Sequence, residues 1–473
     1  MRVTKDIITE LERIVGSNNI ITDDVELTVY EADGSFVYTA KPDVVVFPPR
    51  STEEVAKVVR VAWENRIPII GRGSGTSLSG GALPIEGGIV ISLTRMNRVL
   101  ELDVENETAT VEAGGVINLW VSDALARLNY QYPIDLGYYF PADPGSQRVS
   151  TIGGNISHNA GGVKCFKYGV TVNNVRGLKV VLPPNGEVRF FGGKVVESPG
   201  YDVVGIISGS EGTMAIVTEA VLRIVSNYES VKTILAAFNS VEDAGTAVSR
   251  IISSGIRPVA LEFMDKIAVN AIEAGPWGGG GLPTDAEAIL LIDVEGSEPG
   301  TNAEASRIIE ILKSSGAYMV KLAKDRAEAN RWWNARKQAF GAMGFVGPNY
   351  ITGDGTIPRK KLPEALHRIR EIGNKYGFRI ANVFHAGDGN LHPLILYDER
   401  RPGEREKALQ AEDEILRMCV EIGGTITGEH GVGYHKKHLI GLLYTDYELN
   451  VMKNIKSVFD PLGIMNPGKI FPR

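Results

Sequence analysis

Apolar residues near the start of the chain recur with the spacing of a helix. Residues 4–15 place theirs every three or four positions, which predicts an amphipathic helix with Thr4 as its cap. The residues on its apolar face are Ile7, Ile8, Leu11, Ile14 and Val15. Residues 43–47 then form an apolar run between two prolines, which indicates a buried strand.

A second helix and strand lead into a glycine-rich loop. Ser51 and Glu54 have the spacing of a capping box ahead of the segment VAKVVRVAWEN, which predicts a helix. The apolar segment IPII follows and runs directly into GRGSGTSLSGG, residues 71–81. The pattern therefore predicts a strand–helix–strand unit that ends in this loop.

Short strand patterns dominate from residue 87 to residue 225. The segments GIVISL, ATVEAG, LKVVLP, EVRFF and MAIVTEAVLRI are apolar or alternating, and glycine-rich loops separate them. Beyond residue 228, TILAAF and AILLIDVEG predict strands, SVEDAGTAVSRIISSG predicts a helix, and residues 276–281 predict a loop. Helical patterns recur at 325–341, 360–376 and 404–423. We therefore expect two domains, 1–225 and 226–473, with a tail at 440–473 that can return to the first.

Charge and cysteine content exclude several classes of protein. The chain has 50 Lys and Arg against 57 Asp and Glu, a net charge of −7, which argues against a nucleic-acid partner. Cys165 and Cys419 are too few for a disulfide framework. The N-terminal segment is charged throughout, and no run approaches the ~18 apolar residues of a membrane span. We expect a soluble cytoplasmic protein, with attachment to a membrane through a partner as the open alternative.

The loop at residues 71–81 can present backbone N–H groups to an anion. Glycine tolerates the positive φ angles that turn successive N–H groups toward one point. The loop is not a P-loop, because GxxxxGK[ST] is absent, and it is not GxGxxG, because Leu78 stands where the last glycine is needed. Taken alone, it is equally compatible with a plain turn between strands.

Two later blocks combine glycine with polar side chains. Residues 141–169 place two Gly-Gly pairs among asparagines and hydroxyl residues, and residues 209–220 place Glu211, Gly212 and Thr213 before an apolar strand. Such side chains can hydrogen-bond a flavin ring edge or a ribityl chain while glycine keeps the wall thin.

In this order, the three blocks resemble the FAD-binding domain of the vanillyl-alcohol-oxidase (PCMH-type) flavoprotein superfamily. The resemblance implies that the first block binds the FAD pyrophosphate through Gly73, Ser74, Gly75, Thr76 and Ser77. For the ring and the ribityl chain it implies Pro141, Asp143, Gly154, Asn155, Asn159, Gly162 and Tyr168. The third block adds Glu211, Thr213, Ile216 and Val217. Covalent members carry a histidine where this chain has Thr76, so we expect non-covalent FAD and interpret His158 as a hydrogen-bonded loop residue.

Histidines cluster in the second half, where five of the seven lie after residue 380. The segment NVFHAGDGNLHPLILY, residues 382–397, has a strong turn signal between apolar flanks and predicts a hairpin. His385 and His392 would face opposite sides of one straight strand, but they can converge across a hairpin. Downstream, Glu429 and His430 lie between glycines. Two imidazoles and a carboxylate could bind Zn²⁺ or a similar divalent ion, and an unligated histidine could transfer protons.

These segments resemble the C-terminal cap domain of the FAD-linked D-2-hydroxy-acid dehydrogenases, a group that includes glycolate oxidases and D-lactate dehydrogenases. Other segments agree with it: ALEFMDK, WWNARKQAF, GDGTIPRKKLP and MNPGKIF. The resemblance spans residues 20 to 472 and implies an α+β fold, a PCMH-type FAD-binding domain plus an antiparallel-sheet cap domain with flanking helices. It assigns the metal, expected to be zinc, to His385, His392 and Glu429, proton abstraction to His430, and the substrate carboxylate to Arg336.

The implied reaction is FAD-dependent oxidation of a small D-2-hydroxy acid, D-lactate or glycolate, by metal-assisted hydride transfer. Phe340 stands where the dicarboxylate enzymes have polar groups, which favours a monocarboxylate. We expect residues 435–438 to form a solvated basic stretch. The electron acceptor stays open among oxygen, a quinone, an iron–sulfur subunit and an electron-transfer flavoprotein, and a homodimer is expected from the resemblance. The alternatives are an oxidase of another alcohol, a flavin subunit that only passes electrons, and a nucleotide-binding module without redox chemistry.

Overall fold

The structure is a computed structural model that describes residues 3–48, 51–131, 137–195, 199–276 and 279–472. The chain divides into two compact units. The first contains residues 1–161, 169–227 and 429–473, and the second contains residues 162–168 and 228–428. Each unit has its own sheets and its own hydrophobic core.

The first unit begins with a small sheet that carries the first glycine loop. Its order is β1 (Ile20–Ile21), β2 (Val44–Val46), β4 (Ile89–Ser92) and β3 (Ile69–Arg72), and β4 runs parallel to both β2 and β3. Helices α1 (Lys5–Val15) and α2 (Thr52–Asn65) bury their apolar faces in the same core. Thr4 and Ser51 cap these helices through the backbone N–H groups of Ile7 and Glu54, as predicted.

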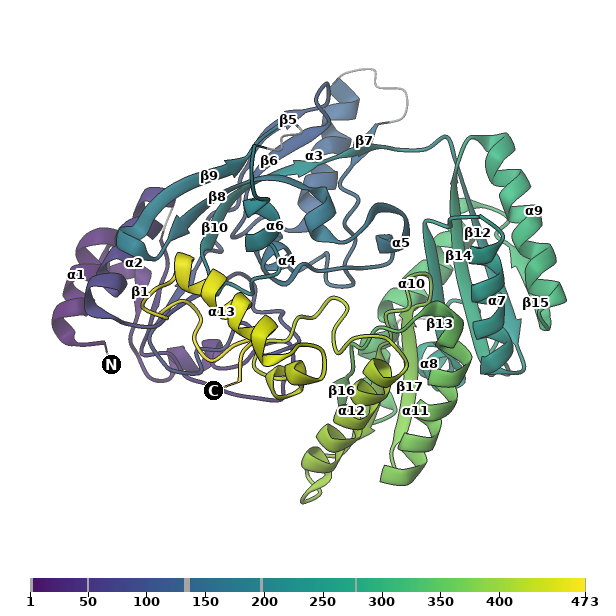
Figure 1. Ribbon diagram of the computed structural model, residues 1–473. Helices are drawn as coiled ribbons and strands as arrows, with labels where there is room; N and C mark the ends of the chain where they lie inside the picture. The colour runs from purple at the N-terminus through teal and green to yellow at the C-terminus, as the bar shows by residue number, and fades with distance from the viewer. Residues whose placement is uncertain (1–2, 49–50, 132–136, 196–198, 277–278, 473) are drawn as a thin grey trace. The chain divides into compact units, whose positions relative to one another are not determined.

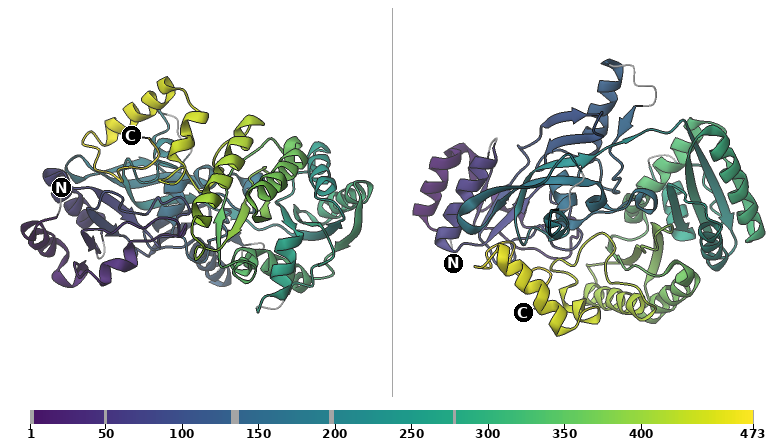
Figure 2. Two further views of the ribbon diagram at one scale, coloured as in Figure 1. Left: turned by 90° about the horizontal axis from the view of Figure 1, so that it is seen from below. Right: turned by 45° about the horizontal axis from the view of Figure 1, so that its top comes forward.

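The first unit also contains a five-stranded antiparallel sheet. Its order is β5 (Val99–Asp103), β6 (Thr108–Glu112), β10 (Ile216–Arg223), β8 (Val175–Leu182) and β9 (Glu187–Gly192). A two-stranded sheet joins β7 (Tyr138–Tyr139) to β11 (Val225–Ser226). The helices are α3 (Asn118–Gln131), α4 (Ile152–His158), α6 (Val203–Ile207) and, from the C-terminal segment, α13 (Asp446–Phe459). Both views of Figure 2 keep this yellow C-terminal segment beside the purple and teal elements of its own unit.

The second unit is a seven-stranded antiparallel sheet with helices packed on it (Figure 1). The strand order is β15 (Ala317–Leu322), β12 (Ser230–Phe238), β14 (Ala288–Gly296), β13 (Ala260–Asp265), β17 (Arg379–His385), β18 (Pro393–Tyr397) and β16 (Asn349–Thr352). The helices are α5 (Cys165–Tyr168), α7 (Val241–Ser253), α8 (Lys266–Ala274), α9 (Glu298–Ser314), α10 (Arg326–Ala342), α11 (Leu362–Tyr376) and α12 (Glu404–Glu421). The predicted strands and helices of this half are confirmed, apart from the loop at 276–281, where residues 277 and 278 lie outside the described residues.

The face of this sheet that α8 and α10 cover carries the candidate site residues. Helices α8 and α10 share a core with alternate residues of the strands, including Met264, Val383 and Leu394. Because side chains alternate between the faces of a sheet, Glu262 and His385 point to the same face as these three residues. His392 lies just before β18, and its ring centroid is 6.1 Å from that of Phe340 on α10. The sheet therefore delivers one carboxylate and two imidazoles toward α10.

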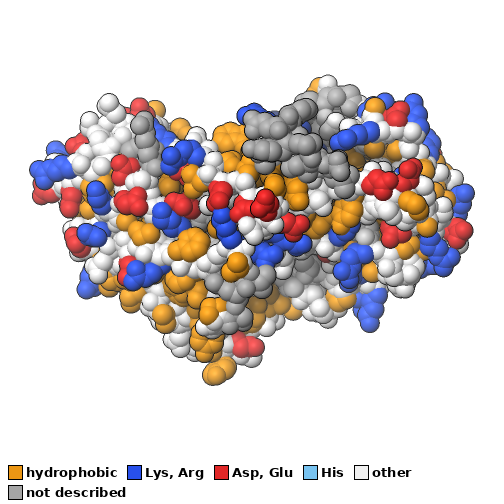
Figure 3. Space-filling model, turned by 90° about the horizontal axis from the view of Figure 1, so that it is seen from above, with side chains coloured by type: hydrophobic (Ala, Val, Ile, Leu, Met, Phe, Trp, Pro, Cys, Tyr) orange, Lys and Arg blue, Asp and Glu red, His pale blue; other side chains and the backbone are white. Residues whose placement is uncertain are grey.

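The distribution of surface charge and the state of the two cysteines bear on the expectations from composition. Acidic and basic side chains are interspersed over the face drawn in Figure 3. Cys165 and Cys419 are both free. None of the helices in the described part of the chain combines the length and the hydropathy that a bilayer span requires.

Candidate active site

The first glycine loop leaves β3 with its backbone open to a ligand. Within the described residues, the N–H groups of Ser74 to Leu78 donate no hydrogen bond inside the fold. Gly75 has a φ of +72°, and a Cβ on Gly73 would lie 2.2 Å from Oγ1 of Thr151. The Ser77 hydroxyl holds the end of the loop by accepting from the Gly81 N–H at 3.0 Å. A row of free N–H groups on a turn with glycine at positions 73 and 75 fits a pyrophosphate.

The second block contains a helix that the sequence pattern did not reveal. Helix α4 is capped by Thr151 and ends at Asn159, whose φ is 52°. Asn155 hydrogen-bonds Asn118 in the interior, and the Asn159 carboxamide oxygen accepts from the Val172 N–H at 2.9 Å. Of the FAD residues implied by the resemblance, these two amides therefore already have protein partners.

The remaining FAD residues differ in how they could reach a ligand. Ile216 and Val217 are buried in separate hydrophobic cores of the first unit, so only their backbone is available. Pro141 is buried, and Oδ1 of Asp143 is buried without a hydrogen-bond partner in the described structure. The Thr213 hydroxyl donates to the Ser210 carbonyl oxygen at 2.7 Å. Gly162 and Tyr168 belong to the second unit, where the Tyr168 hydroxyl donates to the Glu295 carboxylate.

Glu211 holds the segment that carries His430. Its side chain is buried, and its two carboxylate oxygens accept from the N–H groups of Val432 and Gly433, each at 2.7 Å. Burial raises the pKa of this carboxyl, and the charge of His158 and the two N–H groups oppose that rise. The resemblance assigns Glu211 to FAD, whereas its observed partners are the backbone of residues 432 and 433.

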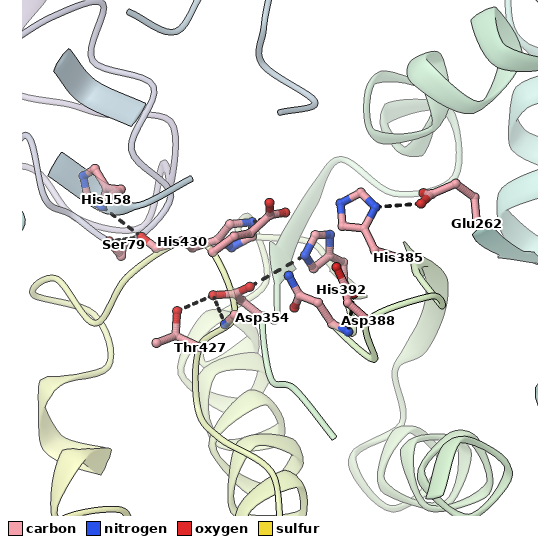
Figure 4. Close-up of polar contacts among 12 residues, drawn as sticks. Ser79, His158, Glu262, Asp354, His385, Asp388, His392, Thr427 and His430 are labelled. Atoms are coloured by element: carbon pink, nitrogen blue, oxygen red, sulfur yellow. Dashed lines mark hydrogen bonds and ion pairs between the residues drawn. The ribbon is translucent and has the colours of Figure 1, made fainter. Parts of the chain in front are cut away.

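The His430 backbone is held from a second side. The Ser79 hydroxyl donates to the His430 carbonyl oxygen at 2.9 Å, and Nδ1 of His158 lies 3.1 Å from the same oxygen (Figure 4). A carbonyl oxygen only accepts, so Nδ1 of His158 carries the proton in this contact. His158 is thus a hydrogen-bonded loop histidine, as expected. The backbone of residues 430–433 is fixed by partners from three separate segments of the first unit.

The expectation of a solvated basic stretch at residues 435–438 is wrong. His435 and Lys436 are 6% and 2% exposed, Lys437 is intermediate, and His438 is exposed. The N–H groups of Tyr434 and His435 both donate to the Ser79 carbonyl oxygen, which turns the chain inward. The Tyr38 ring then packs edge-on against His435, with centroids 5.6 Å apart. The pattern of charges did not reveal this burial, because it depends on contacts with Ser79 from a distant loop.

The C-terminal segment reinforces the first glycine loop. The Asn466 carboxamide donates to the carbonyl oxygens of Gly81 and Glu211, at 2.8 Å each. Nζ of Lys469 donates to the Leu83 carbonyl oxygen at 2.6 Å, and burial lowers the pKa of Lys469 to about 8. Residues 465–471 therefore stabilise the loop that is implied to bind FAD.

In the second unit, a carboxylate joins a histidine to an arginine. Glu262 lies directly opposite His385 in the β13–β17 pair and is fully buried. Its Oε1 lies 2.8 Å from Nδ1 of His385, and its Oε2 lies 2.6 Å from Nη2 of Arg336 on α10. Burial alone would raise the Glu262 pKa, but the charges and hydrogen bonds of His385 and Arg336 outweigh it and lower the pKa.

The two hairpin histidines converge as predicted. The rings of His385 and His392 are 5.2 Å apart, and both side chains are buried. Nε2 of His392 lies 3.6 Å from the buried Asp354 carboxylate (Figure 4). His385, with Nδ1 bound to Glu262, keeps Nε2 for a metal. The residue types and burial of this cluster fit a divalent cation.

The second unit holds the residues that directly precede Glu429. The Gly428 N–H donates to the Asp354 backbone oxygen at 2.9 Å and lies 3.2 Å from the Asp354 carboxylate, and the Thr427 hydroxyl donates to that carboxylate. Glu429 is the next residue, so its Cα lies about 3.8 Å from that of Gly428. Asp354 therefore holds Thr427 and Gly428, the two residues that precede Glu429.

Glu262 and Asp354 are the residues that the sequence interpretation missed. Both lie in segments that the resemblance already used, ALEFMDK and GDGTIPRKKLP. A glutamate inside an otherwise apolar strand, ALEFM, is the signal that could have found Glu262, because a buried charge needs a partner. The partner of Asp354 lies 74 residues away, and no local pattern reveals it.

Comparisons with known proteins place the chain in a family. The model of the FAD binding domain matches residues 42–192, and the model of the C-terminal domain of FAD linked oxidases matches residues 228–470. The chain is 41% identical over 467 residues to the glycolate oxidase subunit GlcD of Escherichia coli (strain K12), covering 98% of this chain and 91% of that protein. It is 33% identical over 477 residues to a D-lactate dehydrogenase of Anaerostipes hadrus, covering 99% and 98%. The chain therefore belongs to the FAD-linked oxidases and is an FAD-dependent oxidoreductase.

A solved structure confirms the fold. The crystal structure of p-cresol methylhydroxylase with substrate bound matches with a TM-score of 0.78 at 18% identity, over 99% of this chain and 97% of that one. The fold class expected from the sequence, an FAD-binding domain followed by an antiparallel-sheet domain with helices, is confirmed.

Proposed function

We propose that this oxidoreductase converts a small 2-hydroxy acid, glycolate or D-lactate, to the 2-oxo acid with non-covalent FAD and a divalent metal, zinc. The observation that carries the proposal is the buried group of His385, His392 and Arg336 on one face of the sheet of the second unit. The names of the two relatives above, a glycolate oxidase subunit and a D-lactate dehydrogenase, support the substrate class.

His385, His392 and Glu429 would hold the metal in the proposed site. Two neutral imidazoles and one carboxylate leave a coordination position open, as catalytic zinc sites require. The Nδ1 contact with Glu262 orients His385, and Asp354 fixes the residues ahead of Glu429. When bound, the metal supplies Lewis acidity that favours ionisation of the substrate hydroxyl.

Arg336 would bind the substrate carboxylate. Glu262 takes one of its donors, and Nε of Arg336 is buried without an acceptor in the described structure. A guanidinium offers five donors in a fixed fork, so the remaining ones can meet a carboxylate. Phe340, one helical turn further along α10, packs 6.1 Å from His392 and supplies an apolar wall. Such a wall favours a monocarboxylate.

His430 would accept the hydroxyl proton of the substrate. Its backbone is held by Ser79 and His158, and the next residues by Glu211, so its side chain starts from a fixed position. An imidazole has a pKa suited to proton transfer near neutral pH. FAD, when bound, supplies the two-electron acceptor for the C2 hydride. The loop at 73–78 would hold its pyrophosphate through free N–H groups.

The electron acceptor of the reduced flavin is proposed to be a partner protein. The Escherichia coli relative is named as a subunit of a glycolate oxidase, which supports an assembly with another chain. An iron–sulfur subunit and an electron-transfer flavoprotein are both compatible with this proposal.

An anaerobic titration of the purified protein tests the substrate class. Glycolate or D-lactate should bleach the flavin absorbance stoichiometrically, and L-lactate should not. A chain that only passes electrons would show a flavin band that none of the three acids bleaches. A colourless protein that cannot be reconstituted with FAD would contradict the cofactor assignment.

A further inference from the structure

Glu262 contacts both a proposed metal ligand, His385, and the proposed substrate-binding arginine, Arg336. Its Oε1 faces Nδ1 of His385 at 2.8 Å, and its Oε2 faces Nη2 of Arg336 at 2.6 Å. The Glu262 side chain is fully buried, and those of His385 and Arg336 are each 8% exposed. Each carboxylate oxygen thus has a distinct partner in an environment without competing solvent.

We propose that Glu262 is a positioning residue that orients the metal ligand and the substrate-binding arginine together. Accepting from Nδ1–H fixes the tautomer of His385 and leaves the Nε2 lone pair for the metal. The ion pair of Oε2 with Nη2 at 2.6 Å restricts the rotation of the Arg336 guanidinium, which sets the direction of its other donors. The inference rests on the proposed function, because it assigns Glu262 a role in that same site.

The strand geometry explains why a glutamate can do this from outside the site. Glu262 and His385 are a directly opposed pair in neighbouring antiparallel strands, where side chains on one face lie closest. Arg336 approaches from α10, which covers that face. The backbone of Glu262 is therefore held by the sheet, and the contacts of its carboxylate restrict the side-chain torsions of His385 and Arg336.

Only a carboxylate satisfies both partners. It presents two acceptor oxygens, whereas a glutamine presents one acceptor and one NH₂ donor. In Glu262→Gln the NH₂ group must face either the His385 N–H or the Arg336 N–H, donor against donor. The structure therefore predicts that this nearly isosteric change weakens metal binding and substrate binding in one step.

The test compares four FAD-loaded proteins: wild type, Glu262→Gln, Glu262→Asp and the control Asp293→Asn. Asp293 is a buried carboxylate on β14 of the same sheet, and its observed partner is the Thr233 hydroxyl at 2.6 Å. Each protein is depleted of metal and titrated with Co²⁺, whose d–d absorption reports binding without turnover. KM and kcat for the best 2-hydroxy acid are then measured with metal in excess.

We expect Glu262→Gln to bind Co²⁺ roughly 10- to 100-fold more weakly than wild type, as for other partners of metal-bound histidines. Its KM should rise even when metal is saturating, because Arg336 has lost its orientation. Glu262→Asp, which keeps the charge, should recover part of both losses, and Asp293→Asn should resemble wild type.

Three results have separate meanings. Co²⁺ binding and KM that are unchanged in Glu262→Gln would overturn the positioning role while the proposed function stands. Equal losses in Asp293→Asn would also overturn it, since they would reflect general destabilisation. Wild type that binds no Co²⁺, with His385→Ala indistinguishable from it, would reject the metal site itself.

Discussion

Replacing Glu211 by glutamine should release the segment that carries His430. In the wild type two backbone N–H groups, those of Val432 and Gly433, donate to separate oxygens of one buried carboxylate at 2.7 Å. Hydrogen bonds to charged groups contribute about 1.5–3 kcal/mol each. A glutamine can accept only one of them, as a neutral bond of about 0.5–1.5 kcal/mol, and it leaves the other donor facing an NH₂ group.

The net loss worked from these contacts is roughly 2–4 kcal/mol. If the segment opens locally, a loss of this size raises its amide exchange rate by roughly 30- to 1,000-fold, since about 1.4 kcal/mol corresponds to a factor of ten. Hydrogen–deuterium exchange with mass spectrometry, read on peptides that cover residues 429–434, measures it directly.

The control for this experiment is Glu219→Gln. Glu219 lies on β10 of the same unit and pairs with Lys179 at 2.9 Å, and neither side chain is fully buried. Its substitution should leave exchange of residues 429–434 unchanged. Exchange in Glu211→Gln within about twofold of wild type, with FAD bound normally, would refute the reasoning, because the exchange ratio converts to well under 1 kcal/mol.

Three further changes have expected outcomes. Arg336→Lys should lower kcat/KM about 10- to 150-fold, mainly through KM, because a point charge cannot replace a fork; an unchanged KM in steady-state assays would count against the carboxylate role. His430→Ala should keep FAD bound but slow flavin reduction about 10²- to 10⁴-fold in stopped flow, and wild-type rates would exclude it as the base. Burial raises the pKa of Asp293 to about 6, so folding favours its protonated form. The free energy of unfolding should therefore fall by roughly 3 kcal/mol as pH rises from about 4 through about 6. Melting temperatures of Asp293→Asn should therefore vary less over this pH range, and an identical pH dependence would contradict the assignment.

The sequence predicted the elements whose periodicity is strong. The helices at 4–15 and 404–423 and the hairpin at 382–397 are confirmed, because their apolar spacing and turn residues are local signals. Helix α4 escaped prediction because its sequence, IGGNISH, has little helical propensity and depends on the Thr151 cap and on packing. The sequence identified His385 and His392 as a candidate pair, and the β17–β18 register determines how closely their rings approach.

The contacts that shape the site were less visible. Glu262 meets His385 across 123 residues of sequence, and Glu211 meets Val432 across 221. Such pairings depend on which strands become neighbours, and no local pattern fixes that order. The expected exposure of His435 and Lys436 failed for the same reason, because the Ser79 carbonyl oxygen that turns them inward comes from a distant loop.

The central claim, a metal-assisted oxidation of a 2-hydroxy acid by FAD, is tested most directly by single-turnover flavin reduction before and after metal removal. The FAD-loaded protein is mixed anaerobically with D-lactate or glycolate as isolated, after exhaustive chelation, and after Zn²⁺ is restored. We predict rapid reduction, loss of at least about 100-fold in rate when metal is removed, and recovery with Zn²⁺. Full-speed reduction by the chelated protein, at verified zero metal content, would contradict the account.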